Sequence, residues 1–134
     1  MKGKMLYMWK ETIICIIIIC LIIFGEIVTQ KYTKNVVESL NSDLKELKEL
    51  IISKSDSKAI EKINYIHEKI NRKNEVLAYY MEHDELEKLE TNFTSCKIFV
   101  ESKEYNLALN ELEKTIFALE HLTEKYSFNL DNIF

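Results

Sequence analysis

The residues best suited to chemistry are gathered around His83. His83 and Glu87 are one helical turn apart, with Asp84 adjacent, so an imidazole and two carboxylates would lie close together. Zinc accepts such donors, but it requires three or four ligands that converge on one point. A helix corner explains the same residues, because Asp84 and Glu87 have capping-box spacing. We interpret His83, Asp84 and Glu87 as a corner motif of unknown role and predict no metal site.

The remaining sequence shows no catalytic pattern. It contains no Gly-rich phosphate loop, no paired His motif, and no Ser, Thr or Cys with a base at motif spacing. We therefore expect no enzyme, no catalytic residue and no cofactor. The formal net charge of −4 comes from interspersed Lys and Glu, which argues against a nucleic-acid partner. Of the 3 Cys, Cys96 alone lies beyond the N-terminal apolar run and is expected to fill a helix core.

That apolar run determines where the protein can reside. Residues 13–24 contain no charged, amide or hydroxyl side chain. A bilayer core about 30 Å thick requires roughly 20 residues of helix, and residues 5–28 supply that length if Lys10 and Glu11 extend to the headgroups. The sequence predicts a transmembrane helix centred on Ile13, Ile14, Ile16, Ile17, Ile18, Ile19, Leu21, Ile22, Ile23 and Phe24.

The flanking residues favour a permanent signal anchor over a cleaved signal peptide or a lipoprotein signal. Signal peptidase requires small residues at the cut, but Gly25 has only large or charged neighbours. Cys20 follows three isoleucines, which do not suit a lipid-attachment site. Three lysines precede the run and two follow closely, so the positive-inside rule predicts an internal N-terminus and an extracytoplasmic C-terminal region.

Composition and periodicity predict helices beyond the anchor. The chain has 0 Pro and 2 Gly, and no Gly follows residue 25. Apolar residues recur at three- and four-residue steps in four segments. The stripes are Val37, Leu40, Leu44, Leu47 and Ile51; Ala59, Ile63, Ile66, Ile70, Leu77 and Tyr80; Leu86, Leu89, Phe93, Cys96 and Val100; and Tyr105, Ala108, Leu112, Ile116, Leu119, Leu122 and Tyr126.

Three interruptions separate these stripes. Serine-rich residues 53–57 favour a turn with Ser55 or Asp56 as N-cap, and residues 102–104 favour a short reversal. The register changes near residue 83, where we favour a tight corner over a continuous, rewound helix. The first helix can also run on directly from the anchor. The predicted fold is all-α, with an N-terminal transmembrane helix (residues 1–30) followed by an antiparallel helical bundle of three to four helices (residues 31–134).

The last eight residues are unusually apolar for so charged a protein. Phe128, Leu130, Ile133 and Phe134 can form a strap that folds back over the bundle, which is the reading we favour. The alternative is a peptide that docks on another membrane protein. Both readings depend on the same side chains.

Three sequence stretches carry a resemblance to a known family. Residues 80–86, residues 105–112 and the terminal residues 128–134, following one N-terminal span, resemble domain-of-unknown-function family 4363. These are small single-span helical proteins of spore-forming Gram-positive bacteria. The resemblance implies a membrane location and a helical architecture, and it implies no activity. It also implies a membrane-protein partner.

Together these observations predict a single-pass protein of the cell membrane that acts without catalysis. Its expected partners are membrane lipid and another integral membrane or envelope protein, which it binds or stabilises through its bundle or tail. One alternative is a small membrane protein that self-associates through its span and affects permeability. A ligand-sensing ectodomain is a further alternative. The oligomeric state is left open by the sequence.

Overall fold

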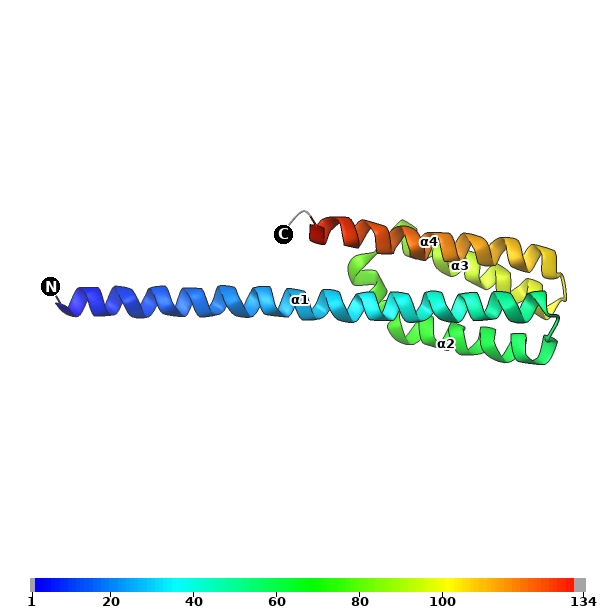
Figure 1. Cartoon of the computed structure of the whole chain (residues 1–134), viewed down its shortest axis with the longest axis horizontal. Helices are drawn as coiled ribbons and strands as arrows, with labels where there is room; N and C mark the ends of the chain where they lie inside the picture. Colours follow the sequence, from blue (N-terminus) through cyan, green and yellow to red (C-terminus); the bar gives the residue numbers. More distant parts are fainter. Residues whose placement is uncertain (1, 132–134) are drawn as a thin grey trace. The chain divides into compact units, whose positions relative to one another are not determined.

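Helices account for most of the chain in the computed structural model. The structure describes the fold of residues 2–131, and the side-chain surroundings of residues 2–79 and 81–125. The helices are α1 (Lys2–Ile52), α2 (Asp56–Tyr80), α3 (His83–Glu101) and α4 (Tyr105–Asp131) (Figure 1). The chain divides into two compact units, Met1–Tyr32 and Thr33–Phe134. The predicted all-α class, a long apolar N-terminal helix and a helical bundle, is confirmed.

The first unit is a helix with exposed apolar side chains. The ten large apolar side chains of residues 13–24 are between 49% and 66% exposed. The hydroxyls of Thr12 and Thr29 donate back to the carbonyl oxygens of Met8 and Gly25, at 2.8 and 2.7 Å. These polar side chains are therefore satisfied within the helix. By length and composition this helix can cross a membrane.

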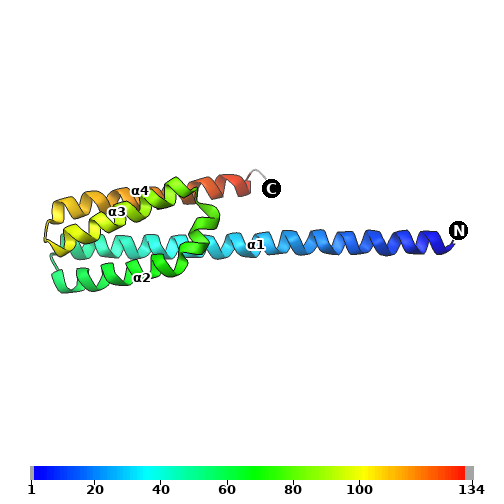
Figure 2. The same ribbon diagram turned by 180° about the vertical axis from the view of Figure 1, so that it is seen from behind.

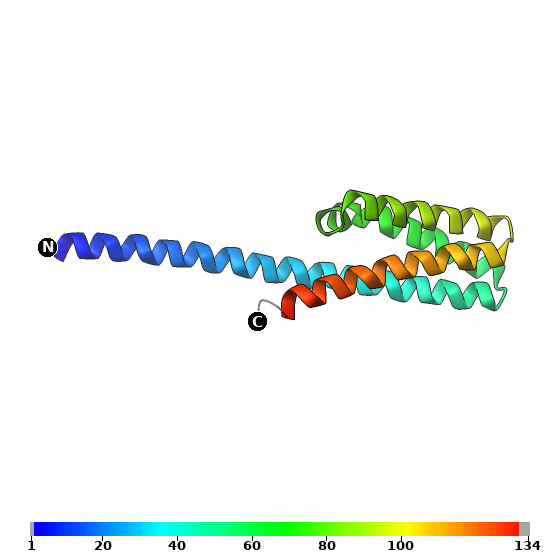
Figure 3. The ribbon, with the colours of Figure 1, turned by 90° about the horizontal axis from the view of Figure 1, so that it is seen from above.

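The second unit is an up-and-down bundle of residues 33–52 of α1 with α2, α3 and α4. Its helices lie side by side in alternating directions, with both turns at one end and the α2–α3 corner at the other (Figures 1, 2 and 3). The four predicted stripes meet in one core, where Leu44, Leu47, Ile63 and Leu89 are fully buried. Burial of these stripes supplies most of the driving force for folding.

The two turns are built in the same way. Lys54 and Lys103 adopt left-handed backbone conformations, with φ of 55° and 59°. In each turn the residue after this lysine donates to a carbonyl five residues earlier, at 3.0 Å to Leu50 and 2.8 Å to Phe99. This is the Schellman ending of a helix, which usually places Gly where these lysines stand. Both turns were predicted from sequence, although not their left-handed lysines.

The corner between α2 and α3 confirms the predicted break and excludes a continuous helix. Met81 is extended and buried, and its amide donates to the carbonyl of Leu77 at 2.8 Å. The predicted capping box is wrong, because α3 begins at His83 with Glu82 as N-cap and no side-chain cap. Asp84 lies in the first turn of α3 instead, where its negative charge interacts favourably with the helix dipole. Burial of Met81 fixes the start of α3 two residues before the position that capping spacing predicts.

The N-cap of α2 is Ser55, one of the two predicted residues, but its hydroxyl does not cap the helix. That hydroxyl lies 3.1 Å from the hydroxyl of Ser53 instead. The negative charge of Asp56 in the first turn favours the same helix end. The position of this N-cap was therefore predictable from the sequence, but the hydrogen bond of its hydroxyl was not.

The hairpins α1–α2 and α3–α4 are equivalent, although they share little sequence. Counted from the left-handed lysine, the buried residues of α1 and α3 fall at the same positions. They pair as Val37 with Leu86, Leu40 with Leu89, Leu44 with Phe93, Leu47 with Cys96, and Ile51 with Val100. The α3 and α4 backbones approach each other most closely, because Cys96, Ala108 and Thr115 are small.

The C-terminal segment differs in part from the predicted strap. Helix α4 continues to Asp131, so Phe128 and Leu130 belong to a helix and not to a separate segment. The sequence between Tyr105 and Asp131 contains no Gly or Pro that would end the helix earlier. The side chains of Phe128 and Leu130, and the whole of Ile133 and Phe134, lie outside the described residues.

Candidate functional site: the grooves between the helices

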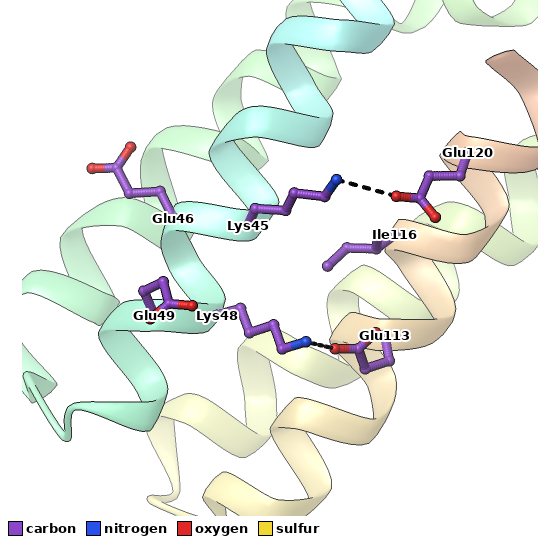
Figure 4. Close-up of a pocket in the computed structure, with 7 residues that line it drawn as sticks. All are labelled: Lys45, Glu46, Lys48, Glu49, Glu113, Ile116 and Glu120. Carbon is purple, nitrogen blue, oxygen red and sulfur yellow. Dashed lines mark ion pairs between the residues drawn. The ribbon is translucent and has the colours of Figure 1, made fainter.

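The groove between α1 and α4 is lined by charged side chains from both helices. Lys45 pairs with Glu120 at 3.2 Å and Lys48 pairs with Glu113, on either side of Ile116 (Figure 4). The hydrogen bond and charge of Glu113 raise the pKa of Lys48. The open hollow has a volume of about 500 Å³. Lys45 and Lys48 are both paired with carboxylates of α4, so the groove is a seam between helices in which neither lysine is free to bind an anion.

A denser cluster joins α1 to α2 around Asp43. The carboxylate of Asp43 accepts from Lys69 at 2.6 Å and from Lys62 at 3.0 Å. Lys62 also donates to Glu46 at 2.7 Å, and Lys69 to the hydroxyl of Ser39 at 2.5 Å. The side chains of Asp43, Lys62 and Lys69 are only 14–16% exposed. This cluster therefore lies at the margin of the core, where charges are costly unless paired.

Pairing shifts the protonation equilibria of the cluster. Burial raises the pKa of Asp43, but the hydrogen bonds and charges of Lys69 and Lys62 outweigh it and leave that pKa below its usual value. Burial lowers the pKa of Lys62, but Glu46 and Asp43 outweigh it and leave that pKa raised. Both shifts favour the charged forms, as expected for groups that hold one another in place.

The groove between α2 and α3, and the turn end, also carry polar contacts. The amide of Asn74 donates to Glu90 at 2.6 Å, and the ring of His67 stacks on Phe93 at 6.2 Å. At the turn end, the hydroxyl of Tyr105 donates to Asp56, which raises the pKa of Tyr105. These contacts join α2 to the next helix, α3, and to α4.

The groove between α3 and α4 is different. Among the described side chains, the ion pair at this groove lies at its corner end, where Lys125 of α4 is 3.7 Å from Glu82, the N-cap of α3, and no hydrogen bond or ion pair joins the two helices along their length. Phe117 stands on the outer face of α4, 71% exposed, and its ring stacks on His121 at 6.4 Å. Beside it is an open, mainly apolar hollow of about 520 Å³, to which Asn92 and Ala118 contribute. This groove is the candidate binding surface of the bundle.

The side chains of the corner motif do not converge on one point. His83, Asp84 and Glu87 are all exposed, and Asp84 and Glu87 border a shallow hollow with Lys88 and Thr91. Within residues 2–131 no three His, Cys, Asp or Glu side chains are close enough to hold a metal ion. The three residues lie in the first two turns of α3, after the corner that Met81 and Glu82 form.

Cys96 is fully buried in the bundle core. Burial, and to a lesser extent the charge of Glu111, raises the pKa of its thiol to about 12. The thiolate is the reactive form of cysteine, so Cys96 is unreactive at neutral pH. Its position in the core agrees with the predicted role as a small apolar filler.

The family comparison covers this same bundle. A family model, Domain of unknown function (DUF4363), matches residues 27–133. The chain belongs to this family. No curated protein and no solved structure matches it.

The DUF4363 match begins after the ten apolar side chains of the predicted span. The matched residues include the four bundle helices, their two turns and the corner, and they exclude the apolar run. The match confirms the predicted family, and the helical architecture is shown by the structure itself. It supplies no activity.

Sequence reasoning missed the polar seams of this DUF4363 bundle. Lys62 and Lys69 are seven residues apart, as are Glu113 and Glu120, so each pair repeats on one flank of its helix. That spacing was the available signal, but it does not say which helix faces which. Phe117 was missed because it lies outside the apolar stripe of α4, as an isolated aromatic residue on the polar face.

Proposed function

We propose that this protein is a membrane-anchored, non-enzymatic helical module that binds or stabilises another membrane protein of the cell envelope. The observation that carries the proposal is the exposure of its N-terminal apolar side chains. None of the most apolar stretch of that helix is buried, whereas the core of the second unit is closed by its own residues. So much uncovered apolar surface requires lipid or protein around it.

The energetics support lipid as that environment. Each Ile, Leu or Phe at the centre of a spanning helix contributes roughly −0.3 to −0.6 kcal/mol on an insertion scale, or about −3 to −6 kcal/mol for ten. The backbone of this stretch is helical, so its amides and carbonyls are paired internally. Insertion therefore leaves no backbone polar group unsatisfied. The lysine distribution favours an internal N-terminus and an external bundle.

The non-enzymatic part of the proposal rests on how the charged groups are used. In the described part of the bundle, the most buried carboxylate and ammonium groups, those of Asp43, Lys62 and Lys69, pair with one another. The buried thiol of Cys96 is held in its unreactive form. Because its polar groups hold the helices together, the bundle is suited to presenting a surface to a partner. The apolar C-terminal segment is the candidate docking element for a partner, which is the alternative to the strap that the sequence favours.

A matched pair of substitutions tests the anchor. Ile18 and Ile98 are 50% and 56% exposed, one in the apolar run and one in the bundle. Ile18→Lys places a charge at the span centre, which is unfavourable by about 2.5–3.5 kcal/mol, and is expected to release protein from membranes at alkaline pH. Ile98→Lys is expected to stay with the membrane. Equal retention of both variants in the membrane, or recovery of the wild type in the soluble fraction, would refute the anchor.

Crosslinking in native membranes tests the partner. The wild type is expected to recover another membrane protein, identified by mass spectrometry, and deletion of residues 130–134 is expected to abolish that recovery. Circular dichroism and thermal melting of the deleted form must match the wild type. Loss of the fold on deletion would assign the tail to the bundle and not to a partner.

A further inference from the structure

We propose that Glu26 pairs with a lysine or arginine in a spanning helix of another membrane protein, and that this helix packs on the face of α1 that carries Glu26. The inference rests on the proposed function and names the chemistry of the partner. It depends on the depth of Glu26 in the span, on the residues that share its face, and on the contacts of its carboxylate within the chain.

The depth of Glu26 places its carboxylate inside the apolar layer. Glu11 and Glu26 are the two carboxylates of the predicted span, fifteen residues apart. That separation is about 22 Å along a helix, and the hydrocarbon core is about 30 Å thick, so the two cannot both lie outside it. The predicted span brings Glu11 to the inner headgroups together with Lys10, which leaves Glu26 several Å inside the outer boundary. A charge at this depth is unfavourable unless a partner satisfies it.

The charged, amide and hydroxyl side chains of residues 11–30 all lie on one face of the helix. At about 100° per residue, they fall within about 60° of the direction of Glu26. We call this the Glu26 face, and its polar members are Glu11, Thr12, Glu26, Thr29 and Gln30. The opposite face is apolar apart from one thiol. Its members are Ile13, Ile14, Ile17, Cys20, Leu21, Phe24 and Val28.

This division separates a surface for lipid from a surface for protein. An apolar face can lie directly against acyl chains without cost. Ionisable residues in spanning helices almost always face protein or a water-filled cavity. The Glu26 face is therefore the side of the span on which a neighbouring helix packs.

The chain itself supplies no counter-charge to Glu26 along the helix. Residues one turn before and one turn after it include no lysine or arginine. In the described part of the chain, its carboxylate accepts from the amide of Gln30 at 3.2 Å and forms no ion pair. By contrast, Asp43 in the bundle is paired with two lysines. The missing cation has to come from another molecule.

Charge complementarity identifies that molecule as a different protein. Two copies of this chain insert in the same orientation, so a two-fold axis between their spans would place Glu26 opposite Glu26 at the same depth. Like charges repel strongly where the dielectric constant is low. A lysine or arginine of another spanning helix meets the requirement, because such a residue also needs a partner of opposite charge in the membrane.

Photocrosslinking of the full chain in its native membrane tests which face meets the partner. Benzoylphenylalanine is placed at residue 22, on the Glu26 face, or at residue 24, on the apolar face, which differ little in depth. Irradiation is expected to link residue 22, and not residue 24, to a spanning segment of another protein. Mass spectrometry of the linked peptide is expected to find a lysine or arginine in that segment.

Substitution of Glu26 tests the charge itself. Glu26→Gln is expected to lower the yield of the crosslink from residue 22 about tenfold. Glu38→Gln is the matched control, because Glu38 is an exposed carboxylate of the same helix that pairs with Lys34, and it is expected to change the yield less than twofold. Replacing the partner's cation by methionine should lower the yield as Glu26→Gln does. The two substitutions together should recover most of the loss, because neither charge is then left unpaired.

Four results would each overturn the proposal. They are a crosslink to a second copy or to lipid alone, equal or absent crosslinks from residues 22 and 24, a linked segment without lysine or arginine, and an unchanged yield for Glu26→Gln. Recovery of a partner that does not depend on Glu26 would refute the pairing and leave the proposed function standing. Wild-type protein in the soluble fraction would refute both. Membrane retention and circular dichroism are checked for every variant, and if Glu26→Gln is not retained, the substitution in the partner decides the outcome.

Discussion

Removal of the Asp43 carboxylate is expected to destabilise the bundle far more than removal of an exposed ion-pair partner. Asp43→Asn preserves the shape of the side chain but withdraws the negative charge that Lys62 and Lys69 share. Lys62 would keep Glu46, which is largely exposed, and Lys69 would keep the hydroxyl of Ser39. Two ammonium groups that are only 14–16% exposed would thus lose their main counter-charge.

The expected magnitude lies between two known limits. Breaking a fully buried ion pair by removing one partner costs about 3–5 kcal/mol, whereas an exposed pair contributes about 0–1 kcal/mol. Asp43 is mostly buried but near the surface, so water can solvate the abandoned lysines in part. We expect a loss of about 2–3 kcal/mol in the free energy of unfolding. The exposed pair of Lys45 and Glu120 is the matched control, and Glu120→Gln is expected to lose less than about 0.5 kcal/mol.

The assay is denaturant unfolding of the full chain in mild detergent. Unfolding is monitored by circular dichroism at about 222 nm, where α-helices give a strong signal. The midpoint should fall for Asp43→Asn while the slope is unchanged, since the surface exposed on unfolding is the same. A triple variant, Asp43→Leu with Lys62→Met and Lys69→Met, should recover most of the loss by replacing charge with apolar packing. A loss below about 0.5 kcal/mol for Asp43→Asn, or equal losses for Asp43→Asn and Glu120→Gln, would refute the reasoning.

Three further outcomes are expected. Lys54→Gly and Lys103→Gly should each raise stability by about 0.5–1 kcal/mol, measured by thermal melting, because Gly adopts the left-handed conformation without the penalty that lysine incurs. The pKa of Asp43 is lowered by folding, so its contribution should be present above about pH 4 and lost as pH falls below that value, a loss that Asp43→Asn should not show in acid titration. Cys96 should react with thiol reagents at neutral pH only after denaturation, as mass spectrometry of the labelled protein would show.

The positions of the helices could be predicted from the spacing of apolar residues. Residues that recur every three or four positions lie on one face of a helix and are buried together. The predicted stripe from Leu86 to Val100 is buried throughout, and the change of register near residue 83 coincides with the observed corner. Capping was less predictable. At the corner the burial of Met81 decided where α3 begins, and a short-range capping pattern carries no information about that burial.

The candidate binding groove could not be predicted in the same way. Phe117 and Asn92 belong to different helices, and their proximity depends on the packing of α3 against α4. Helices α3 and α4 pack closely because Cys96 and Ala108 are small. In the sequence this feature appears only as two small residues within stripes of larger apolar residues. A single Phe on a polar face does not by itself identify a binding surface, because isolated exposed apolar residues are common.

The charged seams also explain how this bundle excludes its mirror-related arrangement. An up-and-down bundle with the same apolar stripes can place α2 on either side of α1, since both arrangements bury the same core. Here the acids of α1 face Lys62 and Lys69 on α2, and its lysines face Glu113 and Glu120 on α4. In the opposite arrangement the acidic flank of α1 would face α4, while the flank of α2 with Lys62 and Lys69 and the flank of α4 with Glu113 and Glu120 would both face α3, so none of these ion pairs could form. The polar seams therefore select one winding, which explains why charges near the core are retained although apolar residues would pack as well.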